Sequence, residues 1–400
     1  MGEGERGGEV KARRESEVVY FTVVKKEIKM KNRFIQLVAI SLITLTGFTS
    51  CNPKVKLVTG SYSAKGDSGI NVFDFDQAKG TLSPVGTFNA GPNPSYFCFN
   101  RKLNLIYAIN EVDSFIKPRS GGLTTIKHNG KFGDLKKVNE LAVPNGGPCF
   151  ISITPQNDFL LIANYGGGSV AVVKLDEYGL PVSVTDIVHF SGADGSVSHA
   201  HMIISDDAGG RIYVSDLGLD RVWIFELNRA AGRLKTLLPE GLALPKGTGP
   251  RHFLFNAEGT RLYLICELNS TINVFNIDRE KGLVPIQTIS TLKEGYTGEN
   301  SCADIHLSSS GKFLYGSNRG ENDIVTFEIN EDGTIKPVGH TDCGGNWPRN
   351  FAIDPLGKFL LAGNQRSGNI AVFRLDSNTG IPSQKVYDYK IAAPVCLKFK

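Results

Sequence analysis

The stretch GTGPRHFLFNAEGTRLYLICELNST, residues 247–271, contains the pattern that decides the fold. Turn-forming residues lead into a short apolar run, a tight turn follows at Gly259, and a second apolar run ends in a polar segment. Two short apolar runs joined by a glycine turn predict an antiparallel hairpin. This hairpin carries Arg251 and His252 at the start of its first strand and Glu267 at the end of its second.

The same pattern recurs along the chain. Related stretches lie at residues 91–111, 145–165, 198–217, 300–319 and 346–365. The later units continue with a third strand of alternating pattern, such as RVWIFELN or TINVFNID, and then with a weaker fourth strand. A period of about 45 to 55 residues with four antiparallel strands per unit is typical of a β-propeller blade.

The two ends of the chain complete one further unit. APVCLKFK, residues 393–400, matches the first strand of a unit. KLVTGSY (56–62), GINVFDFD (69–76) and the strand after Gly80 match the second, third and fourth strands. We therefore predict an all-β fold: a seven-bladed β-propeller of four-stranded antiparallel blades, closed by pairing of the C-terminal strand with the N-terminal strands.

The residues before this domain have a different character. MKNRFIQLVAISLITLTGFTSC, residues 30–51, has a short basic head, an apolar stretch and small residues before Cys51. This pattern is typical of a bacterial lipoprotein signal, in which the cysteine is acylated, and an uncleaved anchor is the alternative. Residues 1–29 are polar and form a leader or a gene-model extension, which leaves residues 52–400 for the propeller.

Composition excludes several classes of protein. With 41% hydrophobic and 21% charged residues among 400, the chain has an ordinary globular make-up, and we expect a monomer. The net charge of +4 is small and the propeller has no basic cluster, so no nucleic acid is expected as a partner. No CxxC pair occurs, so we expect neither a metal nor another cofactor, although an exported chain could oxidise an adjacent pair of cysteines. The six cysteines after Cys51 lie mostly in apolar runs: Cys98, Cys149, Cys266, Cys302, Cys343 and Cys396.

Aligned units place two polar columns at one end of every blade. The start of the first strand and the end of the second lie at the same end of a hairpin, so both columns face one mouth of the central channel. The first column is Ser95, Cys149, His201, Arg251, Ala303 and Arg349, and the second is Glu111, Tyr165, Leu217, Glu267, Arg319 and Gln365. A neighbouring column indicates a structural turn role, and it reads Asn110, Asn164, Asp216, Cys266, Asn318 and Asn364.

Three arginines, one or two histidines and a carboxylate at one mouth predict an anion-binding site with an acid or base. Inter-blade salt bridges are the alternative interpretation. Like charges gathered at one mouth are costly unless an anionic ligand joins them, and this favours a site.

Several motifs resemble a known family. Four stretches resemble the bacterial 6-phosphogluconolactonases of the seven-bladed propeller lactonase family: SHAHMIISDD, GTGPRHFLFNAEGTRLYLICELNST, CADIHLSSSGKFLYGSNRG and WPRNFAIDPLGKFLLAGNQ. The order PRH, ELN, SNRG and NQ is specific, and the resemblance covers about residues 55–400. The family is related to fungal carboxy-muconate lactonizing enzymes, whose site uses a histidine, arginines and a glutamate. By this resemblance those roles fall on His199 or His201, Arg251, Glu267 and Arg319.

The resemblance implies hydrolysis of a small anionic sugar lactone without a metal. Arg251 and Arg349 would hold the anionic end, and Arg319 would lie near the carbonyl oxygen. His201 is the favoured base, because a glutamate beside arginines has a lowered pKa; Glu267 would orient His201 or an arginine. Further candidates for substrate binding are His199, His252, Asp304, His306 and Gln365.

Three functions remain open at this level. The chain is a lactonase acting on 6-phosphogluconolactone or another aldonolactone, a cycloisomerase of the muconate-lactonizing type, or a non-catalytic envelope propeller that binds a glycan or protein. The lipoprotein signal predicts a lipid-anchored protein that faces the periplasm, with membrane contact only through the lipid. There an unphosphorylated lactone, a uronate or a surface glycan is the expected ligand. Without the signal the protein would be cytoplasmic.

Overall fold

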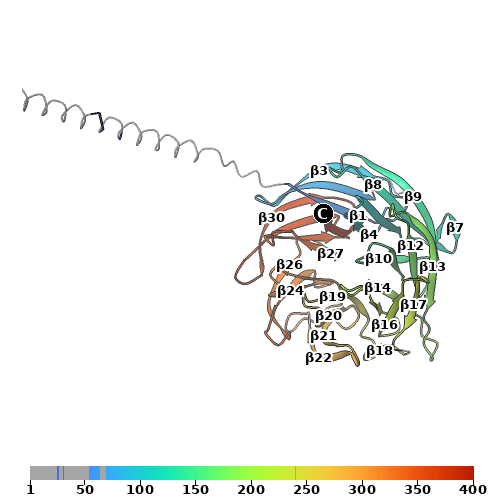
Figure 1. The fold of residues 1–400 in the computed structure, drawn as a ribbon. Helices are drawn as coiled ribbons and strands as arrows, with labels where there is room; N and C mark the ends of the chain where they lie inside the picture. The colour runs from blue at the N-terminus through green and yellow to red at the C-terminus, as the bar shows by residue number, and fades with distance from the viewer. Residues whose placement is uncertain (1–24, 27–29, 31–53, 64–68, 239) are drawn as a thin grey trace, which may run out of the picture. The chain divides into compact units, whose positions relative to one another are not determined.

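Seven sheets surround a central channel in the part of the chain that the structure describes (Figure 1). The computed structural model describes residues 25–26, 30, 54–63, 69–238 and 240–400. Cys51, and almost all of the predicted leader and signal, lie outside the described residues. Among the described helical residues, none belongs to a helix with the length and apolar character that a membrane crossing needs.

The closing blade combines both ends of the domain, as predicted. Its order is β3-β2-β1-β31, where β1 (Val55–Ser61), β2 (Ile70–Asp76) and β3 (Thr81–Phe88) pair with the C-terminal β31 (Pro394–Phe399). The backbone of β31 runs antiparallel to β1 beside the C-terminus (Figure 1). The seven-bladed closed propeller is therefore confirmed.

Residues 247–271 belong to one regular blade. β19 (Pro250–Phe255) and β20 (Arg261–Cys266) make its inner hairpin, and β21 (Thr271–Asp278) and β22 (Gly282–Ser290) follow outward. Three more blades share this order: β10 (Pro148–Ile153), β11 (Phe159–Asn164), β12 (Ser169–Leu175) and β13 (Pro181–His189); β23 (Ser301–Leu307), β24 (Phe313–Arg319), β25 (Asp323–Ile329) and β26 (Ile335–Asp342); β27 (Pro348–Ile353), β28 (Phe359–Asn364), β29 (Asn369–Leu375) and β30 (Pro382–Lys390).

Two blades depart from the predicted four strands. The first of them adds a small hairpin, and the outer edge of the second is divided between two short strands. The first consists of β4 (Tyr96–Asn100), β5 (Leu105–Asn110), β8 (Ser120–His128) and β9 (Leu135–Pro144) with the added β6 (Ser114–Phe115) and β7 (Lys117–Pro118); the second consists of β14 (Ala200–Ser205), β15 (Arg211–Asp216), β16 (Arg221–Asn228), β17 (Arg233–Thr236) and β18 (Leu242–Ala243).

The core lies between neighbouring blades, because the second strand of a blade is covered on both faces. β5, β11 and β28 are buried along their whole length, whereas nearly all residues of the outer β30 are exposed or half-buried. Tyrosines of second strands also tie blades together: the Tyr107, Tyr263 and Tyr315 hydroxyls donate to the carbonyl oxygens of Gly179, Gly333 and Gly380. All six cysteines of the described residues are buried and unpaired, as expected for small apolar side chains.

The asparagine column has the structural role that its repetition indicated. Each side-chain amide donates to a backbone carbonyl of the segment that enters the blade. Asn318 Nδ2 lies 2.8 Å from Thr291 O, and Asn364 Nδ2 lies 3.0 Å from Cys343 O. These bonds fix the turn beside the second polar column, so the residues at the mouth project from a rigid frame.

Candidate active site

A polar cavity of about 250 Å³ opens at the predicted channel mouth. It is lined by Tyr62, Glu111, Cys149, Tyr165, His201, Glu267, Arg319 and Arg349. A narrower recess adjoins this cavity, shares Glu111, Cys149, His201 and Arg349 with it, and adds Ser95, Tyr96, Arg251, His252 and Val395. Members of the two predicted columns therefore meet at one site.

β-Bulges at the start of the inner strands turn several of these side chains into the channel. In the β19–β20 hairpin the register shifts between Pro250 and His252, which leaves Arg251 as the extra residue. A bulge bends the strand and re-aims its side chains, so Arg251 and His252 both line the recess. Equivalent shifts make extra residues of Cys149, His201 and Arg349.

Glu267 is the anionic centre of the mouth. Its Oε2 lies 2.8 Å from Arg251 Nε and 2.6 Å from an Arg319 guanidinium nitrogen. Burial by itself would raise the pKa of Glu267, but the charges of Arg251, Arg319 and Arg349 hold the pKa below its usual value. Glu267 is therefore an ionised group that orients two arginines, and it makes no hydrogen bond with His201.

Arg319 ends β24 in a tightly defined position. Its guanidinium donates to the carbonyl oxygens of Ser301 and Cys302, at 3.1 and 2.9 Å. The next residue is Gly320 at φ 136°, where an added Cβ would lie 2.1 Å from Glu299 O. Only glycine fits this close approach, and the turn thus directs Arg319 toward Glu267. Burial, together with the charge of Arg251, lowers the pKa of Arg319 to about 10.

Arg349 and Glu111 face each other across Tyr62. The Tyr62 hydroxyl lies 2.9 Å from an Arg349 guanidinium nitrogen and 2.9 Å from Glu111 Oε1. Ser95 also donates to Glu111, at 2.5 Å. Among the ion pairs of the described residues, no carboxylate pairs with Arg349. The guanidinium of Arg349 is thus the positive charge at the mouth that a ligand can take up.

His201 is a buried neutral imidazole at the junction of cavity and recess. It is 4% exposed, and its Nδ1 has no hydrogen-bond partner among the residues that the structure describes. Burial lowers the pKa of His201 well below its usual value, and Arg251 and His252 add to the effect. A buried ring nitrogen without a partner costs stability, so its placement beside Arg349 indicates a role toward a ligand.

Comparison with known proteins identifies the family. The model of a family described as "Lactonase, 7-bladed beta-propeller" matches residues 56–399. The chain belongs to this seven-bladed propeller lactonase family. The 6-phosphogluconolactonase of Formosa agariphila is 32% identical over 81% of this chain and 93% of its own length. The 6-phosphogluconolactonase of Bacillus subtilis is 29% identical over 85% of this chain and 97% of its own.

A solved structure is similar over the same region. The periplasmic gluconolactonase PpgL of Pseudomonas aeruginosa has a TM-score of 0.81 and 28% identity, covering 87% of this chain and 99% of its own. The resemblance of the sequence motifs to propeller lactonases is therefore confirmed at the level of family and fold.

This member of the lactonase family assembles most, but not all, of the predicted site residues at the cavity. His201, Glu267, Arg319 and Arg349 line the cavity, and Arg251 and His252 line the recess. The remaining candidates, His199, Asp304, His306 and Gln365, line neither.

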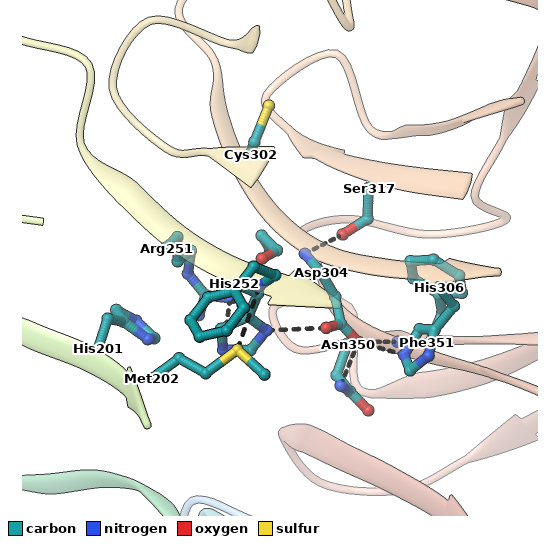
Figure 2. Close-up of polar contacts among 12 residues, drawn as sticks. His201, Met202, Arg251, His252, Cys302, Asp304, His306, Ser317, Asn350 and Phe351 are labelled. Carbon is teal, nitrogen blue, oxygen red and sulfur yellow. Dashed lines mark hydrogen bonds and ion pairs between the residues drawn. The ribbon is translucent and has the colours of Figure 1, made fainter. Parts of the chain in front are cut away.

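Each of these four candidates has another position. His199 stacks on Tyr165 with ring centroids 4.4 Å apart. Gln365 donates its backbone N–H to Trp347 O at 2.9 Å. Asp304 and His306 lie on β23 behind His252, to which Asp304 is hydrogen-bonded (Figure 2). None of these four residues lines the cavity or the recess, so each could act on a substrate only through another side chain.

Sequence reasoning missed several lining residues. Glu111, Cys149 and Tyr165 stood in the two columns but were not chosen, because the family motifs do not contain them. Tyr62 follows β1 in the closing blade, at the position of the second column, and Tyr96 follows Ser95. Extending the alignment to KLVTGSY would have placed Tyr62 at the mouth.

One group of described residues has metal-ligand character: Glu321, Asp323 and His340. The Lys293 ammonium lies 3.0 Å from Asp323 Oδ2 and 3.4 Å from Glu321 Oε1. The Lys293 ammonium thus already pairs with both carboxylates of this cluster, and the cluster's residues do not line the cavity. The group reads as an ion-pair network that joins two blades.

Proposed function

We propose that this chain is a sugar lactonase, a carboxylic-ester hydrolase that opens the ring of a small sugar lactone. One observation carries the proposal: His201, whose Nδ1 is buried and has no hydrogen-bond partner among the described residues, lines the same cavity as the guanidinium of Arg349. A neutral base and a positive charge at the developing oxyanion are the groups that ester hydrolysis needs. The names of the relatives, 6-phosphogluconolactonase and gluconolactonase, support the same chemistry.

The reaction proceeds on side chains of the cavity. His201 accepts a proton from water while the water oxygen attacks the lactone carbonyl carbon. Arg349, rather than Arg319 as the sequence suggested, stabilises the negative charge on the carbonyl oxygen, because Glu267 already holds Arg251 and Arg319. When the ring C–O bond breaks, the proton on His201 passes to the released oxygen. The product is a hydroxy acid, which ionises.

Size and charge limit the substrate. A cavity of about 250 Å³ is smaller than most ligand sites, which span roughly 300–1,000 Å³, and it suits one sugar ring rather than a polymer. Three arginines face Glu111 and Glu267, so one positive charge is in excess. A neutral or singly charged lactone fits this balance. A phosphate dianion or a muconate with several carboxylates brings more negative charge than the site neutralises.

The assay uses purified residues 52–400 with glucono-δ-lactone, 6-phosphogluconolactone, a uronate lactone and cis,cis-muconate, against a spontaneous-hydrolysis blank. We expect hydrolysis of the lactones, fastest for those without phosphate. Cyclisation of muconate would assign the chain to the cycloisomerases. Activity on no substrate would leave the non-catalytic binding function in its place.

The sequence also supports a location. We propose that Cys51 carries a lipid anchor and that the propeller faces the periplasm, because residues 30–51 have the pattern of a lipoprotein signal. The structurally similar PpgL is named a periplasmic gluconolactonase, which agrees with this location. A preference for unphosphorylated lactones would suit a compartment outside the cytoplasm.

A further inference from the structure

Asp304 joins three inner strands next to the recess (Figure 2). Its Oδ1 lies 2.8 Å from His252 Nδ1 on β19. Its Oδ2 accepts hydrogen bonds from His306 Nε2 at 2.9 Å, from Asn350 Nδ2, and from the Phe351 N–H at 3.3 Å. The carboxylate is 3% exposed, so its charge is held entirely by these partners.

This arrangement decides which nitrogen of His252 carries the proton. Burial by itself would raise the pKa of Asp304, but His306 and His252 hold it well below its usual value, so the carboxylate stays ionised. An ionised carboxylate only accepts, so Nδ1 of His252 must donate. Nε2 is therefore the unprotonated nitrogen of the ring, and an Arg251 guanidinium nitrogen lies 3.4 Å from it. His252 lines the recess, and its ring centroid lies 5.1 Å from that of His201 (Figure 2).

His252 differs from His201 in having a carboxylate partner, Asp304, at hydrogen-bond distance. Burial and Arg251 lower the pKa of His252 to about 4, while Asp304 acts in the opposite direction. Burial is the main cause that lowers the pKa of His201 well below its usual value, and the charges of Arg251, His252 and Arg349 add to it. The titratable and charged groups around His252 are Arg251 on its own strand, Tyr96 on β4, His201 on β14, Asp304 on β23 and Arg349 on β27.

We propose that Asp304 is a positioning residue for hydrolysis: it holds His252 with Nε2 unprotonated, and His252 then shares the proton that His201 takes from water. The proposal rests on the lactonase function. As the new C–O bond forms, the proton leaves water for His201 and moves on to His252 Nε2, where Asp304 balances the imidazolium charge. When the ring C–O bond breaks, the proton returns to the released oxygen, so no proton is gained or lost in the exchange.

Asp304→Asn tests this directly, because an amide has one accepting and one donating end. Oδ2 faces three donors, so the amide nitrogen of the variant must occupy the Oδ1 position and donate to His252 Nδ1. His252 then carries its proton on Nε2 and cannot accept another. We expect ¹⁵N NMR of the imidazole to show Nδ1–H in the wild type and Nε2–H in the variant. We expect kcat to fall by roughly a hundredfold, with KM little changed.

Asp323→Asn is the matched control. Asp323 is 1% exposed and its Oδ2 lies 2.9 Å from His340 Nδ1, so it forms a second buried Asp–His pair away from the cavity. This control should lose stability while the folded protein keeps its kcat. If Asp304→Asn behaves in the same way, Asp304 is a strut between blades and the proposal fails. Nε2–H on His252 in the wild type would also overturn it, whether or not the protein hydrolyses lactones. Absence of lactonase activity in a wild type with Nδ1–H would instead refute the proposed function.

Discussion

Arg251 and Glu267 stand 16 residues apart on one hairpin and form an ion pair of 2.8 Å at the channel mouth. The Arg251 side chain is 2% exposed, and it also donates to Ala303 O on the next blade at 2.5 Å. The pair is therefore built before any ligand arrives. Arg251 thus has two partners in the empty site, since Glu267 and Ala303 both hold it.

Arg251→Ala should lower both stability and activity. Removing the guanidinium leaves Ala303 O without its donor and Glu267 with one arginine fewer, which costs about 1–3 kcal/mol. We expect kcat/KM to fall by roughly a hundredfold, the scale of losing one charge-stabilising group. Thermal melting and lactone hydrolysis measure the two effects. A folded variant that hydrolyses lactone at the wild-type rate would reduce Arg251 to a link between blades.

Arg349→Ala should separate activity from stability. Within the described part of the chain, its guanidinium pairs with no carboxylate and makes one side-chain hydrogen bond, to the Tyr62 hydroxyl. Melting should change little, while kcat/KM should fall by about a hundredfold or more. Arg349→Lys should recover only part of the loss, because an ammonium lacks the planar fork of the guanidinium. Full activity of Arg349→Ala would contradict the assignment of this residue to the oxyanion.

Stability should fall as the pH drops below about 6.5, because the buried histidines stay neutral in the folded chain while they gain protons in the unfolded chain. Burial lowers the pKa of His201 and His252, whereas in the unfolded chain both bind protons near pH 6.5. Each contributes up to about 1.4 kcal/mol per pH unit in this window. Urea unfolding at pH 7.5 and 5.0 measures the slope. His201→Asn should flatten it, and His189→Gln, at an exposed position, should not. An unchanged slope in His201→Asn would show that this histidine is charged when folded.

Deleting residues 394–400 should destabilise the whole propeller. β31 pairs with β1, and the Leu397 N–H donates to Asn350 Oδ1 at 2.6 Å. The deletion exposes the edge of the closing blade and removes Val395 from the recess. We expect a melting temperature lower by several degrees, together with loss of activity. A truncated protein that melts as the full chain does would mean that closure contributes little to stability.

Cys51→Ala should release the protein from membranes. Cys51 lies outside the described residues, so this prediction rests on residues 30–51 alone. Acylation at this cysteine would supply the anchor. The wild type and the variant are each expressed from Met30, and the fraction of each protein that partitions into the detergent phase is measured. Equal partitioning of the two would rule out the lipoprotein interpretation.

The sequence by itself determined the architecture and the place of the site. Alternating apolar strands recur between glycine turns, and this period allows only a stack of equivalent hairpins around an axis. Because both ends of each hairpin meet at one mouth, His201, Arg251, Glu267 and Arg319 could be brought together without coordinates. The charge pattern likewise indicated an anion site, since three arginines stand in the two polar columns: Arg251, Arg319 and Arg349.

Only the tertiary structure decided what each side chain does. The bulges that turn Arg251 and His252 together into the channel depend on the pairing of whole strands, and alternation along a single strand does not reveal them. The bond between His252 and Asp304 joins residues 52 positions apart on neighbouring blades. Tyr62 enters the mouth because the closing blade brings it there. Such contacts arise from how the blades pack around the axis, whereas the repeat in the sequence specifies each blade separately.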